Sequence, residues 1–203
     1  MTEFFDTIVT GAQVEAWLAA HLHQWLPTYI AEMERQTGRA AGVLPLPRRY
    51  TTFNRFDKFP EDQLPCIVVV SPGLQDIPAK TGEGRYRARW TLGVGCVVSA
   101  STQEASEELA KVYAAAVRAC VLQRPSLGGH TRGAAWLHER YDDLPTTDSR
   151  SLAAGQVIFW VEVDAVTNVN AGPTQPDPES DYLQPYGDLP VALTADVTLV
   201  KEG

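Results

Sequence analysis

The fold is decided by residues 86–124, YRARWTLGVGCVVSASTQEASEELAKVYAAAVRACVLQR. In the first half of this stretch, apolar side chains alternate with polar or small ones. Alternation with a period of two predicts a β-strand that has one packed face and one face that is exposed or in contact with a partner. The packed face would carry Tyr86, Ala88, Trp90, Leu92, Val94, Cys96 and Val98, and the other face Arg87, Arg89, Thr91, Gly93 and Gly95.

An amphipathic helix is predicted directly after this strand. Ser101 and Glu104 have the spacing of a capping box, in which each side chain satisfies a backbone donor at a helix start. Pro125 and Gly128-Gly129 would end the helix. Its apolar stripe consists of Ala105, Leu109, Val112, Tyr113, Ala116 and Cys120. No side chain in this strand and helix is chemically reactive, so the stretch predicts a fold and not an active site.

The other expected elements surround this unit. A first helix should cover Asp6 to about Arg35 and should end or kink at Pro27, near residues 23–26. Residues 48–62 fit either an irregular strand or a structured loop. The remaining elements are a buried strand at Leu64–Val70, a long loop at Ser71–Gly84, and strands at Ala134–Tyr141 and Gln156–Val169.

This order, α-β-β-α-β-β, predicts an α+β fold with a mixed or antiparallel sheet of about four strands and helices packed on one face. Residues 1–169 would form that domain. Residues 170–203 are rich in Pro, Asp and Gly and would form an extended C-terminal arm. Alternation returns at Val191–Val200, which indicates a terminal strand that adds to a neighbouring subunit or to the protein's own sheet edge.

Composition narrows the class of protein. The chain has 203 residues, with 25 acidic against 17 basic side chains and a formal net charge of −8, which disfavours non-specific binding to nucleic acid. Cys66, Cys96 and Cys120 lack the spacing of metal ligands and are expected to be buried free thiols. No apolar run approaches the roughly 20 residues of a membrane helix, and no signal-peptide core is present, so we expect a soluble protein made in a cytoplasm.

The search for catalytic, metal and cofactor motifs predicts none. The four histidines do not form a pair with ligand spacing, and the two Gly-x-Gly segments are not followed by a helix start. The carboxylate pairs Asp142-Asp143 and Glu162/Asp164 fit a solvated or subunit-facing surface better than a catalytic pair. An active site would have to be assembled from scattered residues.

Three arginines, Arg85, Arg87 and Arg89, should project from one face of the long strand. Such a row suits charge-assisted hydrogen bonds to an acidic partner surface. It equally fits an exposed edge strand that is kept soluble by charge.

The order of elements and three motifs resemble the tail terminator, or tail-to-head joining, proteins of long-tailed bacteriophages. The motifs are the WTLGVGCVV strand, the small-residue helix whose start is marked by Thr102 and Glu104, and the closing V-x-V-x-A-V-T strand. The resemblance covers roughly Val14–Val169. It implies a non-enzymatic virion protein at the junction of tail and neck, which is synthesised in the host cytoplasm and forms a six-fold ring on the end of the tail tube. The ring would stop tube growth and dock the head-side connector or stopper protein, with DNA only passing through its channel and no membrane involved.

A closed ring needs a head-to-tail interface with two different faces. The residues expected to contact a neighbouring subunit or the tail tube are Asp76, Lys80, Glu83, Arg85, Arg87, Arg89, Asp142, Asp143, Glu162 and Asp164. The Ser71–Gly84 loop is expected to touch the tube. The alternatives are another neck component (a head-completion or stopper protein), a bacterial adaptor of a contractile or secretion-related tube, and an enzyme with a scattered site.

Overall fold

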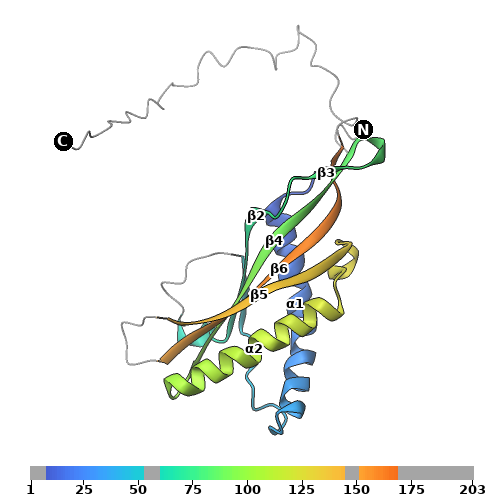
Figure 1. The fold of residues 1–203 in the computed structure, drawn as a ribbon. Helices are drawn as coiled ribbons and strands as arrows, with labels where there is room; N and C mark the ends of the chain where they lie inside the picture. The colour runs from blue at the N-terminus through green and yellow to red at the C-terminus, as the bar shows by residue number, and fades with distance from the viewer. Residues whose placement is uncertain (1–7, 53–59, 145–150, 169–203) are drawn as a thin grey trace, which may run out of the picture.

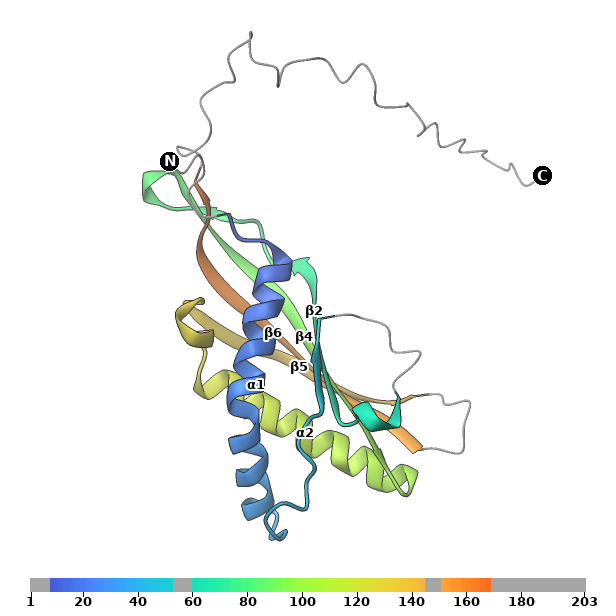
Figure 2. The same cartoon turned by 180° about the vertical axis from the view of Figure 1, so that it is seen from behind.

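A computed structural model of the chain describes residues 8–52, 60–144 and 151–168. In these residues, two helices cover one face of a six-stranded sheet, as the two opposite views show (Figures 1 and 2). The helices are α1 (Gly11–Gln36) and α2 (Gln103–Gln123). The strands are β1 (Arg49–Thr51), β2 (Cys66–Leu74), β3 (Ala79–Lys80), β4 (Arg85–Ala100), β5 (Gly133–Leu144) and β6 (Ser151–Asn168), and short 3-10 turns lie at Glu61–Gln63, Gly82–Gly84 and Leu127–Gly129.

The sheet runs in the order β1-β2-β4-β6-β5, with β3 paired to β4. Only β1 and β2 are parallel among the described pairs, so the sheet is mixed and mostly antiparallel. The expected α+β class and the packing of the helices on one face are confirmed. The expected count of about four strands is too low, because the short strands β1 and β3 carry too few residues to show a period.

Strand β4 lies in the interior of the sheet, between β2 and β6. It pairs with β6 over nearly its whole length, and Leu92 stands opposite Phe159 in the register. The interpretation of β4 as an exposed edge strand is therefore wrong. Its predicted two faces are confirmed, because Leu92, Val94, Cys96 and Val98 are all buried in the core that contains the helices.

Helix α1 continues through Pro27, so it does not end at residues 23–26, which was one of the two outcomes expected at this proline. Leu22 and Leu26 before the proline and Ile30 after it are all buried in the same core. Burial of each such side chain contributes about 1.5–3 kcal/mol, which together outweighs the roughly 3 kcal/mol that an interior proline costs. Tertiary packing holds together a helix that local propensity would interrupt.

Helix α2 begins one residue later than its expected cap. The N-cap is Thr102, whose hydroxyl oxygen accepts a hydrogen bond from the Ala105 amide at 3.2 Å. The predicted capping box of Ser101 and Glu104 is therefore wrong, because β4 runs through Ala100 and the turn needs Ser101 as a spacer. A capping box does form at the start of α1, between Thr10 and Gln13.

Three strands are longer than expected. Strand β2 extends to Leu74 and β3 follows, so much of the expected Ser71–Gly84 loop is hydrogen-bonded to β4. Strand β5 continues to Leu144 and so extends beyond Tyr141, where it was expected to end. Strand β6 already begins at Ser151. The arm at residues 170–203, including its expected strand at 191–200, lies outside the described residues.

The two faces of the sheet differ in what covers them. The main core lies between the helices and the helix-facing side chains of the sheet. On the opposite face, a smaller buried cluster contains no residue of either helix and consists of Leu64, Cys66, Val68, Val97 and Leu152. Further along that face, Thr91, Ile158 and Trp160 are partly exposed. Among the described residues, neither helix therefore covers this second face, which we call the open face.

Candidate interaction surface

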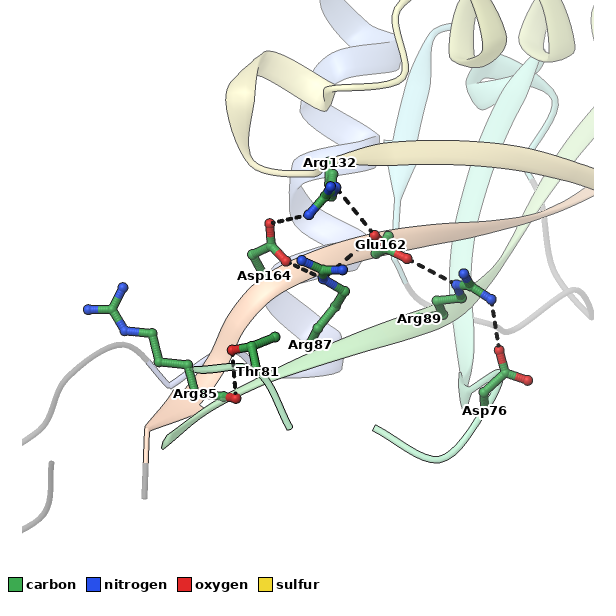
Figure 3. Close-up of polar contacts among 8 residues, drawn as sticks. All are labelled: Asp76, Thr81, Arg85, Arg87, Arg89, Arg132, Glu162 and Asp164. Carbon is green, nitrogen blue, oxygen red and sulfur yellow. Dashed lines mark hydrogen bonds and ion pairs between the residues drawn. The ribbon is translucent and has the colours of Figure 1, made fainter. Parts of the chain in front are cut away.

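A cluster of paired charges occupies one end of the open face (Figure 3). Glu162 lies at its centre, with only 14% of its side chain exposed. The nearest guanidinium nitrogens are Arg89 Nε at 3.1 Å, Arg132 Nε at 3.6 Å and Arg87 Nε at 3.7 Å. One carboxylate thus faces three arginines that come from two different parts of the chain.

Two further carboxylates complete this cluster. Asp164 Oδ1 accepts a hydrogen bond from Arg87 Nε at 2.5 Å, and Asp164 Oδ2 lies 3.7 Å from Arg132 Nη1. Asp76 Oδ2 lies 3.4 Å from Arg89 Nη1. The hydrogen bond from Arg87 to Asp164 raises the pKa of Arg87 further above its already high value. We call these six residues (Asp76, Arg87, Arg89, Arg132, Glu162 and Asp164) the charge cluster.

The sheet register explains why these residues meet. Arg89 stands directly opposite Glu162 in the β4–β6 pairing. Arg132 reaches the same carboxylate because its backbone amide donates to the Glu162 carbonyl at 2.8 Å, just before β5 begins. The β4–β6 register shifts beyond this point, between Tyr86 and Ala88, and Ala165 has a positive φ of 53° there. The register shift interrupts the regular pairing next to the charge cluster, and pairing resumes at Tyr86 and Thr167.

Half of the sequence-predicted contact residues therefore come together, namely Asp76, Arg87, Arg89, Glu162 and Asp164. Lys80 lies in β3 opposite Tyr86, Glu83 lies in the turn that follows, and the Arg85 side chain points away from the charge cluster in Figure 3. Asp142 and Asp143 lie at the other end of the sheet, beside Arg140 and Gln103. Arg132 was missed because it lies outside the alternating strands, and only the register of β5 brings it near Glu162.

The charge cluster changes the interpretation of the arginine row. Within the charge cluster, three arginines face three carboxylates of the same chain. Two residues of the row, Arg87 and Arg89, therefore already have acidic partners without another molecule. Arg89 also lies over the ring of Trp160, with 4.6 Å from its guanidinium carbon to the ring centroid. The arrangement gives a polar, internally compensated rim next to the apolar side chains of the open face.

Strand β5 forms one edge of the sheet, which is a second surface that could contact another protein. No described strand pairs with its outer side. Trp136 and Tyr141 are about half exposed on this strand, and the cationic groups of Arg118 and Lys111 from α2 lie over their rings. An edge that presents aromatic rings and free backbone groups can receive another chain.

Among the described residues, the buried thiols are not activated as nucleophiles. All three cysteines are free and buried, as expected, and burial raises the pKa of Cys66 to about 11 and of Cys120 to about 12. Such thiols carry little thiolate at neutral pH and are poor nucleophiles. In the described part of the chain, no group of three or more His, Cys, Asp or Glu side chains is placed to hold a metal ion. Neither described helix combines the length and apolar character that crossing a membrane requires.

Similarity to known proteins is found in structure and not in sequence. No protein-family model matches it, and no curated protein matches its sequence. Among solved structures, a chain from the virion of a native gene transfer agent (GTA) particle aligns with 17% identity and a TM-score of 0.39. That alignment covers 68% of this chain and 94% of the other.

Proposed function

We propose that this chain is a non-enzymatic virion protein, which forms a six-fold ring at the head-proximal end of a phage-type tail tube. There it stops tube growth and offers a docking surface to the head-side connector. The specific role of tail terminator is proposed because its sequence motifs resemble those of tail terminator proteins. The observation that carries it is the one-sided covering of the sheet, with α1 and α2 on one face and the open face and the β5 edge left for contacts with other proteins.

The two edges of the sheet support a head-to-tail arrangement. The twelve-residue strand β5 forms one edge of the sheet, and the three-residue strand β1 forms the other. A ring of identical subunits uses two different surfaces that fit each other, whereas a two-fold dimer uses one surface twice. Edges of such different length and composition suit the ring. The net charge of −8 suits a channel through which DNA passes without binding.

Light scattering combined with negative-stain images of the purified protein tests this proposal. We expect closed particles with a central hole and a mass about six times that of the 22.2 kDa chain. If the protein is monomeric, purified tail tubes are added, and rings should then appear on the tube ends. Binding to a head-side adaptor but not to tail tubes would replace the tail terminator with another neck component. Failure to bind either would contradict the proposal.

A further inference from the structure

One segment of the chain presents an isoleucine almost completely to solvent. Ile77 lies between the end of β2 and the start of β3, and 94% of it is exposed. Leu74, three residues earlier, is 44% exposed. Single exposed apolar side chains are common, so exposure alone indicates nothing. Ile77 differs from such residues because the backbone on both sides of it is fixed by hydrogen bonds to β4.

The residues before Ile77 are tied to β4. The Gln75 amide donates to the Arg89 carbonyl at 2.7 Å, and the Thr91 hydroxyl donates to the Gln75 side chain at 2.9 Å. Asp76 is paired with the Arg89 guanidinium. The residues after Ile77 are tied to the same strand, because Ala79 pairs with Arg87. Both sides of the Ile77-Pro78 tip are therefore anchored on an interior strand of the sheet.

The base of this segment is fixed as well. The Ser71 amide donates to a carboxylate oxygen of Glu15 in α1 at 2.6 Å, and the Ser71 hydroxyl donates to the Thr91 carbonyl at 2.9 Å. A held segment loses little conformational entropy when a partner binds it. Ile77 is thus presented in advance of binding, which distinguishes it from an apolar residue on a free loop.

The neighbourhood of Ile77 has the composition of an interface centre with a polar rim. Ile77 lines a hollow together with Asp76, Arg87, Arg89 and Glu162, and these four charged residues belong to the charge cluster. Their charges are compensated within the chain, so a partner can cover them without leaving a charge unpaired. Energetically dominant interface residues are typically apolar or aromatic anchors that fill a pocket and are surrounded by such a rim.

We propose that Ile77 is an apolar anchor that enters a hydrophobic pocket of a protein partner, namely the end of the tail tube. This inference rests on the proposed function, since that function supplies the partner. Nucleic acid is a poor match for this tip, because the side chain offers no hydrogen bond and the adjacent Asp76 carries the charge of a phosphate. The charge cluster beside the tip then positions the anchor and contributes little affinity itself.

Co-sedimentation with purified tail tubes tests the anchor. The variant Ile77→Asp should bind tubes at least tenfold more weakly than the wild type, while Ile77→Leu should bind within a factor of about three because it keeps the apolar volume. Val43→Asp is the matched control, because Val43 is 58% exposed on the segment after α1. Particle mass and melting temperature should be the same for all four proteins.

The outcomes separate the two proposals. If the wild type binds tubes and Ile77→Asp binds as well, the anchor is wrong and the proposed function stands. If Val43→Asp loses as much affinity as Ile77→Asp, the effect is one of added charge and the anchor is again wrong. If the wild type itself does not bind tubes, the proposed function fails and the anchor fails with it.

Discussion

The carbonyl oxygen of Ala110 in α2 lies only 2.6 Å from the place that a β-carbon on Gly155 of β6 would occupy. The β-carbon of Ala114, one turn further along α2, lies 3.1 Å from the same place. Real side chains do not approach a backbone oxygen so closely. The helix thus rests directly on the backbone of the sheet at this point, and the absence of a side chain at residue 155 sets the distance between the two layers.

Replacement of Gly155 should therefore push α2 away from the sheet. We expect Gly155→Ala to lower the free energy of unfolding by about 1–3 kcal/mol, the usual cost of an added methyl group in a packed core. Urea denaturation of the wild type and the variant measures this. Gly133→Ala in β5 is the control, since a β-carbon there would meet no atom within 4 Å. Equal midpoints for all three proteins would contradict the close packing.

Loss of the central carboxylate of the charge cluster should destabilise the fold. Glu162→Gln leaves Arg87, Arg89 and Arg132 with less acidic compensation, and we expect a loss of about 1–2 kcal/mol at low salt. The difference should shrink in 0.5 M NaCl because salt screens the remaining charges. The control is Asp142→Asn, which breaks a single exposed pair with Arg140 and should change stability by less than about 0.5 kcal/mol. A Glu162 variant no less stable than that control would show that the charge cluster contributes nothing to folding.

The buried histidine of α1 should make stability depend on pH. His21 is 5% exposed, and its Nε2 has no hydrogen-bond partner among the described residues. Desolvation by burial is the main cause that lowers the pKa of His21 below 6.5, and the nearby charge of Arg124 acts in the same direction. A hydrogen bond with the backbone of Cys120 opposes this shift in part. The native state thus holds His21 neutral where the unfolded chain binds a proton.

Stability should therefore be complete above about pH 6.5 and should fall as the pH drops below that value. Between pH 7.5 and 5.5, His21 should account for a loss of at most about 1.4 kcal/mol, since pH 5.5 lies about one unit below the pKa of an unfolded histidine. Urea midpoints at both pH values measure it. The variant His21→Leu should show a smaller pH dependence than the wild type, whatever its absolute stability. An identical dependence in both proteins would show that His21 does not titrate in this range.

The C-terminal arm should be dispensable for folding. Residues 170–203 have a composition that cannot bury a core, so the proposed domain ends near residue 169. A chain that stops at Asn170 should unfold cooperatively, with a free energy of unfolding within about 0.5 kcal/mol of the full chain. Thermal and urea denaturation of both chains test this. A large loss of stability would show that the arm is part of the folded domain.

Long periodic segments were predictable from sequence because their patterns are redundant. The faces of β4 follow from seven alternating apolar positions, and the stripe of α2 from six positions at helical spacing. Element ends were less predictable. A residue such as Ser101 or Thr102 can cap a helix equally well by its chemistry, and the length of the preceding strand decides between them.

The candidate surface was predictable only in part. Four of its charged residues lie at alternating positions of β4 and β6, and Asp76 lies in the loop after β2, which pairs with β4. Arg132 has no such signal, because the register of β5 against β6 is needed to place it beside Glu162. The open face could not be assigned either, because an alternating pattern shows that a strand has two faces and does not show what covers each.

The sequence by itself determined the α+β class, the long central strand with its two faces, the amphipathic helix after it, and the three buried thiols. These depend on local periodicity and side-chain polarity, which are properties of neighbouring residues. Only the tertiary structure decided that α1 passes through Pro27, that β4 lies inside the sheet, and that Arg87 and Arg89 are paired with Glu162, Asp164 and Asp76. Each of these depends on which distant segments pack together, because burial in a shared core and the register of paired strands are contributed by the whole chain.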